Sequence, residues 1–256
     1  MNNGIYELSD DGKTLLDVTD KNISEAVIPD GVTHIGNSAF SWCRALQSID
    51  IPDSITHIGD RAFHWCEALQ SIEVAEGSQC FASIDGVLFN KDLTQIIRYP
   101  QAKNGNQYTI PNSVTHIGDG AFGLCEALRS IDIPNSVTYI GNRAFYECYK
   151  LQSIDIPNSV THIGDKAFSG CNALQSIDIP NSVTHIGDRV FAHCSNLTSI
   201  HIRITEIDSC CVKENAFYGI DFDNCILYIP SGTRWAYRHH PVFGRFKNIE
   251  IDGSPY

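Results

Sequence analysis

An alternation of apolar and polar residues recurs along most of the chain with a period of 23 residues. The run Ser-Ile-Asp-Ile-Pro occurs at 48–52, 130–134, 153–157 and 176–180. One unit spans 154–176, and near-copies span 26–48, 49–71, 108–130, 131–153 and 177–199, with a degenerate copy over about 200–225. Because so short a unit cannot bury its apolar side chains alone, the period predicts stacked copies in a solenoid.

Each unit predicts the same sequence of local structures. In 153–156 polar and apolar residues alternate, which predicts a short strand with Ser153 and Asp155 facing outward. Residues 157–159 predict a turn, and the β-branched run 160–163 predicts a second strand. Between 167 and 174 the apolar residues fall at steps of three and four, which predicts a short helix. The fold class expected is therefore an α/β repeat solenoid of strand-turn-strand-short-helix units.

Two segments break the period, and each predicts a β-hairpin around a polar turn: 4–18 and 86–99. We expect the first to cap the N-terminal end and the second to be inserted in the stack. A strand beginning at 226 and the aromatic-rich stretch 235–246 predict a C-terminal cap. We expect a single domain over 1–256, composed of an N-terminal hairpin cap (1–25), two repeats (26–71), a degenerate repeat with the inserted hairpin (72–107), four repeats (108–199), a degenerate repeat (200–225) and the C-terminal cap (226–256).

The repeated pattern L-x-S-I-x-I-P-x-S-V-T-x-I-G-x-x-A-F-x-x-C resembles the leucine-rich repeats of the BspA-like class, also called the Treponema pallidum type. The run Ser-Ile-Asp-Gly-Val-Leu-Phe-Asn at 83–90 is also similar to segments common in that family. The resemblance implies a leucine-rich-repeat superhelix. Many family members are exported surface proteins of host-associated bacteria, and several are implicated in adhesion. The resemblance therefore implies a surface or secreted binding protein whose partner is a protein of the host matrix or of another microbe, with a glycan as the alternative partner.

Charge and the sequence ends bear on partner and location. Thirty acidic residues against eighteen Lys and Arg give a net charge of −12, which excludes nucleic acid as the partner because phosphate contacts need clustered cations. No apolar run is long enough for a membrane span, and residues 1–4 lack the features of a signal peptide. The alternative function is therefore an intracellular scaffold for an endogenous protein, cytoplasmic if the chain is complete.

Six of the ten cysteines form one row, each three residues after the phenylalanine of its unit. We predict small buried thiols whose S–H groups point at neighbouring backbone carbonyls. The close pairs of a zinc site are missing, and we expect no metal or cofactor. Four cysteines lie off the row, and the sequence leaves open whether they form a disulfide: Cys80, Cys225 and the vicinal pair Cys210 and Cys211. The row consists of Cys43, Cys66, Cys125, Cys148, Cys171 and Cys194.

An acidic row occupies the outward position of the first strands and is the candidate partner-binding face. At a strand spacing of ~4.8 Å, two carboxylates in water repel each other by about 0.9 kcal/mol. A basic partner or a cation would relieve this repulsion; the alternative is that the row only keeps an exposed sheet soluble. The candidate residues are Asp50, Glu73, Asp132, Asp155, Asp178 and His201, with Ser130, Ser153 and Ser176 beside them.

A second row lies on the second strands and is a possible secondary face. Stacked imidazoles resist simultaneous protonation, so the row could respond to pH, bind a transition metal, or form only a polar aromatic surface. The sequence leaves these alternatives open. The row consists of His34, His57, His116, Tyr139, His162 and His185.

Ser, His and Asp are abundant because the unit is copied, and the sequence contains no Gly-x-Ser-x-Gly, His-Glu-x-x-His or Gly-rich phosphate motif. We therefore predict that the chain is not an enzyme. Residues 226–249 contain four Arg or Lys residues and no Asp or Glu. This basic end favours head-to-tail association of copies; the alternative is a cap whose aromatic residues cover the last repeat.

Overall fold

The structure, a computed structural model, describes residues 4–253 as a β-solenoid in which each repeat forms one coil. A coil consists of a first strand, a turn, a second strand and a run of turns leading to the next coil. The chain divides into two compact units, Met1–Asn104 and Gly105–Tyr256. The predicted solenoid is confirmed, and the single domain over 1–256 stays a prediction.

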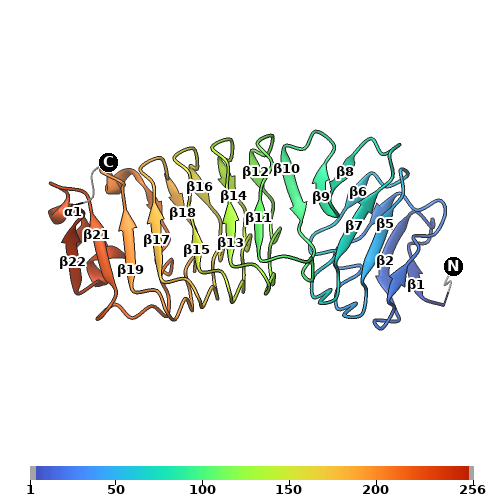
Figure 1. Cartoon of the computed structure of the whole chain (residues 1–256), viewed down its shortest axis with the longest axis horizontal. Helices are drawn as coiled ribbons and strands as arrows, with labels where there is room; N and C mark the ends of the chain where they lie inside the picture. The colour runs from blue at the N-terminus through green and yellow to red at the C-terminus, as the bar shows by residue number, and fades with distance from the viewer. Residues whose placement is uncertain (1–3, 254–256) are drawn as a thin grey trace. The chain divides into compact units, whose positions relative to one another are not determined.

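In the N-terminal unit, first and second strands form separate parallel sheets (Figure 1). The first strands are β3 (Glu25–Ala26), β5 (Ser48–Ile51) and β7 (Ser71–Val74). The second strands are β2 (Thr14–Val18), β4 (His34–Ile35) and β6 (His57–Ile58), and β1 (Tyr6–Leu8) pairs antiparallel with β2. The inserted segment comprises the antiparallel strands β8 (Phe81–Ile84), β9 (Val87–Asn90) and β10 (Gln95–Arg98). Both predicted hairpins are therefore present, and β8 is an additional strand.

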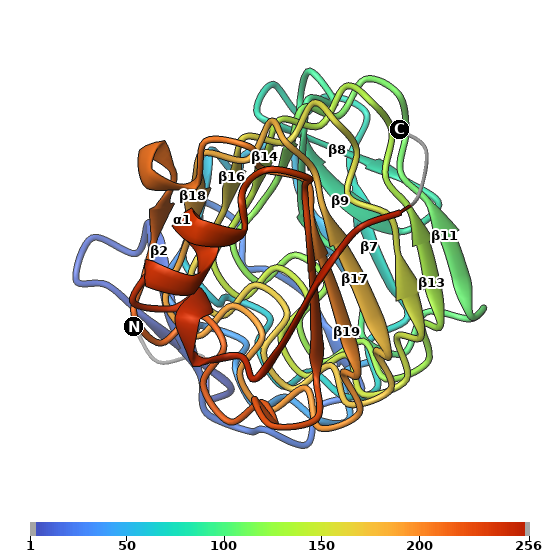
Figure 2. The same ribbon diagram turned by 90° about the vertical axis from the view of Figure 1, so that its left-hand side faces the viewer.

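The C-terminal unit repeats this arrangement over more coils. Its first strands are β11 (Gln107–Thr109), β13 (Ser130–Asp132), β15 (Ser153–Ile154), β17 (Ser176–Ile179), β19 (Ser199–Ile202), β21 (Ile226–Ile229) and β22 (Asn248–Ile251). Its second strands are β12 (His116–Ile117), β14 (Tyr139–Ile140), β16 (His162–Ile163), β18 (His185–Ile186) and β20 (Cys211–Val212). Figure 2 shows β17 and β19 on one side of the coils and β14, β16 and β18 on the other.

The expected short helix of each repeat is not formed, and this part of the prediction is wrong. After each second strand the chain makes consecutive turns, in which Lys166 has φ 56° and Glu147 has φ 54°. A right-handed helix contains no residue with positive φ. Alternate N–H groups bond to the next coil instead, as from Lys166 to the Asp188 carbonyl at 2.8 Å. Among residues 4–253, helical segments occur only after residue 206: η1 (Ile207–Ser209), α1 (Arg234–His239) and η2 (Phe243–Arg245).

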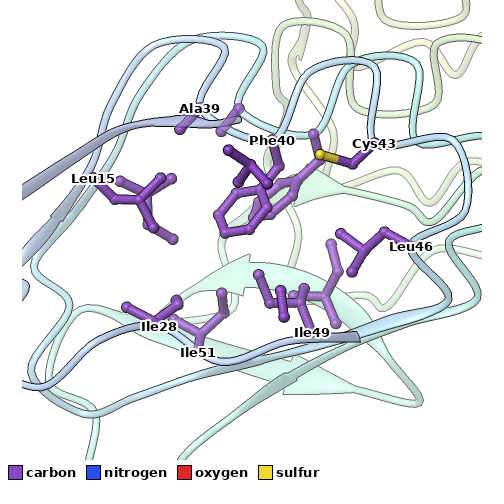
Figure 3. Close-up of a cluster of buried hydrophobic side chains, with 14 of the residues drawn as sticks. Leu15, Ile28, Ala39, Phe40, Cys43, Leu46, Ile49 and Ile51 are labelled. Atoms are coloured by element: carbon purple, nitrogen blue, oxygen red, sulfur yellow. The ribbon is translucent and has the colours of Figure 1, made fainter. Parts of the chain in front are cut away.

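The core of each unit is built from rows of identical side chains. In the C-terminal unit, fully buried phenylalanine rings stack on adjacent coils, with centroids 5.1 Å apart between Phe122 and Phe145 and again between Phe145 and Phe168. The N-terminal unit has the same arrangement, and Figure 3 shows Phe40 and Cys43 pointing inward with the leucine and isoleucine side chains around them. Repetition of the 23-residue unit thus becomes repetition of packing.

The cysteine row is structural, as predicted. The Sγ of Cys148 donates to the Phe122 carbonyl at 3.1 Å, and the Sγ of Cys171 donates to the Phe145 carbonyl at 3.2 Å. Burial raises the pKa of the Cys66 and Cys194 thiols to about 12. All ten cysteines are free thiols, including the four off the row.

Candidate binding face

The strand face is the outward side of the first strands, and the register of the parallel sheets aligns its residues across coils. In the C-terminal unit Thr109 pairs with Asp132, Asp178 with His201, His201 with Tyr228, and Tyr228 with Glu250. The pairing of β13 with β15 places Asp155 next to Asp132. The predicted row is therefore formed, and the structure extends it by residues that the sequence reasoning missed: Thr109, Tyr228 and Glu250.

The carboxylates of this row differ in how far their charge is already compensated. Asp132 and Asp155 are exposed. Asp132 accepts a hydrogen bond of 2.9 Å from the Thr109 hydroxyl, and Asp155 has no hydrogen-bond or ion-pair partner among residues 4–253. Because two adjacent carboxylates without a counter-ion repel each other, a cation bound here would gain free energy.

The C-terminal end of the row is occupied by an internal ion-pair network. Both carboxylate oxygens of Asp178 accept from Arg203, the shortest bond being 2.6 Å from Nη2. Arg203 Nη1 also lies 2.8 Å from Asp252, whose side chain is only 7% exposed and contacts His201 Nδ1 at 3.1 Å. The His201 ring stacks on Tyr228 with centroids 4.4 Å apart. The side chains of Asp178 and His201 are thus engaged within the chain.

Arg203 and Asp252 were missed by the sequence reasoning. A signal for Arg203 was present, because it stands where the preceding repeat has Pro180. Asp252 had no such signal, since it follows β22, a strand outside the recognised repeats.

In the N-terminal unit the row is shorter. Asp50 is exposed and pairs in register with Glu73. Glu73 accepts hydrogen bonds from the hydroxyls of Ser71 and Ser83, whereas Asp50 has no side-chain partner within the described residues. The strands carrying the two carboxylates border a shallow hollow that also includes Ile51, Pro52, Val74 and Ala75.

The serines predicted to lie beside the acidic row do so. Ser130 pairs in register with Ser153, and Ser176 with Ser199. Ser153 and Ser176 are exposed, and Ser130 is half-buried. The face therefore offers hydroxyl groups next to the exposed carboxylates of Asp132 and Asp155.

The second row is also formed, as a stack of rings on the second strands. Centroids are 5.8 Å apart between His34 and His57 in the N-terminal unit. In the C-terminal unit they are 5.7 Å apart between His116 and Tyr139, 4.9 Å between Tyr139 and His162, and 4.8 Å between His162 and His185.

The environment of the second row affects its protonation. Burial and the neighbouring His185 lower the pKa of His162, against a smaller opposing effect of Asp165.

Across residues 4–253, no three His, Cys, Asp or Glu side chains are grouped so that they could hold a metal ion. None of the helices in the described part of the chain is long and apolar enough to cross a bilayer.

The family model of the BspA type leucine rich repeat region, in six copies, matches residues 19–104 and 99–220. The chain belongs to the BspA-type leucine-rich repeat family. The resemblance drawn from the repeated pattern is thereby confirmed. No curated protein matches the chain.

Solved structures of bacterial proteins share the fold. A leucine rich cell surface protein from Faecalibacterium prausnitzii A2-165 is 30% identical with a TM-score of 0.64; the match covers 91% of this chain and 60% of that protein. The pneumococcal vaccine antigen PcpA is 23% identical with a TM-score of 0.67, covering 91% of this chain and 69% of PcpA. A leucine-rich repeat protein from Eubacterium ventriosum ATCC 27560 is 22% identical with a TM-score of 0.59, covering 97% and 93%. The last two likenesses concern the fold alone.

Proposed function

We propose that this BspA-type repeat protein is a non-enzymatic binding module that recognises a basic segment of a partner protein through its strand face. The observation that carries the proposal is the pair of exposed carboxylates at Asp132 and Asp155, one with only a hydroxyl partner and the other with none among the described residues. Asp50 offers a similar group in the N-terminal unit. Asp50 and Asp132 lie on the strands β5 and β13, and Asp155 directly follows β15.

Residues that already form ion pairs within the chain reduce the number of residues that we assign to partner binding. Asp178 and His201 were expected to contribute directly, but Arg203 and Asp252 already hold them. We therefore assign binding in the C-terminal unit to Asp132 and Asp155, with Ser153 as a neighbouring hydrogen-bond donor. A basic group of the partner protein can bind a carboxylate that has no internal ion pair without displacing a cation of this chain.

An adhesin-like role on the cell surface is the finer part of the proposal. It draws on the family and on the Faecalibacterium prausnitzii relative, which is described as a cell surface protein. A protein of the host matrix or of another microbe is the partner class that we propose, and the sequence contains no Gly-x-Ser-x-Gly, His-Glu-x-x-His or Gly-rich phosphate motif that would favour an enzyme.

The test is binding of the full chain to immobilised fibronectin, laminin and collagen and to a lysine-rich peptide, measured by surface plasmon resonance. The variant Asp132→Lys/Asp155→Lys should weaken binding by at least about tenfold, because it places two cations opposite a basic segment. The control Glu126→Lys/Glu214→Lys makes the same change in net charge at exposed positions off the strand face and should leave binding unchanged.

The variant Asp178→Asn removes the charge of a carboxylate that is already engaged within the chain. It should therefore have little effect on the affinity for the partner. If Asp132→Lys/Asp155→Lys binds these ligands as wild type does, or if all of them fail to bind the wild-type chain, the proposal is wrong.

A further inference from the structure

The C-terminal end of the second unit carries exposed cations, three of which have no carboxylate partner within the described residues. Arg234, Arg238, Arg245 and Lys247 are all exposed, and Lys247 Nζ lies 4.0 Å from Asp223. Arg234 and Arg238 donate to backbone carbonyls, and Arg245 lies over the Phe222 ring at 4.2 Å. Within the described residues none of the three guanidinium groups has a carboxylate at ion-pair distance. This end therefore keeps its positive charge on a protein of net charge −12.

The same end exposes apolar surface. Trp235 on α1 is 71% exposed and stacks on His239 with ring centroids 4.4 Å apart. Ile251 on β22, the terminal strand of its sheet, is 40% exposed. An exposed indole beside uncompensated cations is typical of the centre of an interface, where aromatic residues and arginine are enriched.

The N-terminal end of the first unit has the complementary character. Residues 5–30 contain seven Asp or Glu residues and two lysines. One of these lysines, Lys21, pairs with Asp17 at 2.6 Å. Val27 is 78% exposed, Leu16 44% and Ile5 40%, so this end also exposes large apolar side chains. Both ends thus combine apolar surface with charge, and the charges are opposite.

At each of these ends a side chain already occupies one backbone group at or next to the edge strand. Directly after the edge strand β3, the Val27 N–H donates to the Tyr6 hydroxyl at 3.0 Å. On the edge strand β22, the Ile249 carbonyl accepts from Arg234 at 2.8 Å. Side chains that occupy edge groups hinder the addition of a further strand. This favours a contact through side chains over the addition of a strand.

We propose that the C-terminal end of one copy docks on the N-terminal end of a second copy, in a head-to-tail contact held by opposite charge and exposed apolar side chains. The contact is heterologous, because two different surfaces meet, and it can therefore continue from copy to copy. This self-association is separate from the partner-binding role proposed for Asp132 and Asp155 of the strand face.

Sedimentation of the full chain over a range of concentrations tests the proposal. At about 10 mM NaCl, where the Debye length is about 30 Å, the mean mass should rise with concentration; at about 1 M NaCl, where it is about 3 Å, the rise should diminish. Arg238→Glu/Arg245→Glu should weaken association about tenfold or more, as should Glu25→Lys/Asp30→Lys. Mixing these two variants should restore association, since each then meets an end of opposite charge.

Arg143→Glu/Lys166→Glu is the matched control, with the same change in charge on turns away from both ends, and should associate as wild type does. Far-UV circular dichroism checks that each variant is folded, and Trp235→Ser weakens the contact without a charge change. A wild-type chain that stays monomeric at every concentration in low salt overturns the proposal. So does association that survives reversal at both ends.

Discussion

The substitution Gly164→Ala tests how the coils are held at their spacing. Gly164 closes the second strand of its repeat, and an alanine Cβ there would lie 2.7 Å from the Asn142 nitrogen and from the Gly141 carbonyl carbon. Favourable contacts between carbon atoms lie at about 3.5–4.0 Å. Both clashing atoms belong to the backbone of the preceding coil, so no side-chain rotation removes the overlap.

Relief of this overlap requires the two coils to move apart, which weakens the bonds between them. The Gly164 N–H donates to the Ile140 carbonyl at 2.8 Å, and the Asp165 N–H donates to Asn142 Oδ1 at 2.8 Å. Overpacking costs typically about 1–3 kcal/mol and each such hydrogen bond contributes about 1 kcal/mol. We expect a loss of about 3 kcal/mol, which lowers the unfolding midpoint by about 6–12 °C in a protein of this size.

Thermal and urea unfolding followed by far-UV circular dichroism measures the loss. Two control glycines give a graded series: a Cβ at Gly123 would lie 3.3 Å from the Gly120 carbonyl oxygen, and a Cβ at Gly253 meets nothing within 4 Å. The destabilisation should therefore decrease from Gly164→Ala to Gly123→Ala to Gly253→Ala. A Gly164→Ala chain as stable as wild type would refute the conclusion that close backbone approach sets the coil spacing.

Four further predictions concern single residues of the C-terminal unit. Phe168→Ala should cost about 3–5 kcal/mol in urea unfolding, because it leaves a cavity between two stacked rings in a fully buried position; a loss below about 1 kcal/mol would contradict this packing. Lys166→Gly should stabilise the chain by about 0.5–1 kcal/mol by relieving positive φ, and a less stable variant would show that the side chain matters more than the backbone. Because the pKa of His162 is lower in the folded state, the contribution of this residue to the free energy of unfolding is complete above pH 6.5 and is lost as the pH falls through the folded-state pKa. Melting at pH 7 and pH 5 should therefore show a smaller drop for His162→Tyr, which places in the row the residue found at Tyr139, and an equal drop would be evidence against this cause. Cys211 is exposed and the other nine thiols are buried or half-buried, so a maleimide should label the native chain rapidly at Cys211. Cys211→Ser should abolish that fast labelling, and labelling that stays fast would contradict the assignment.

The inward and outward assignment of the first strands could be predicted from the sequence because strand periodicity is local. Ile154 and Ile156 are buried and Asp155 is exposed, as the alternation indicated. The 23-residue period also fixed which residues become neighbours, since stacking identical coils aligns equivalent positions. The buried thiols of Cys148 and Cys171 follow from the same alignment.

The turns that replace the expected helix could not be predicted in this way. Apolar residues at steps of three and four also suit a succession of turns whose side chains point into one core. The deciding feature is the left-handed backbone at positions such as Lys166, Arg189 and Trp42, residue types that give no local signal for positive φ. These conformations persist because N–H groups of one coil bond to carbonyls of the next, as from Phe168 to Val190 at 2.9 Å.

The repeat, the rows and the existence of an acidic strand face follow from the amino-acid sequence, because each depends on spacing along the chain. Which carboxylates of that face are available depends on contacts between coils that the spacing does not contain. Asp178 meets Arg203 one coil away, and Arg203 in turn meets Asp252 on a strand outside the repeat pattern. Asp155 has the same residue type and the same position in its repeat, yet no cation lies within reach among the described residues. Compensation of a charge depends on distance in space, and a periodic sequence assigns the same chemistry to both residues.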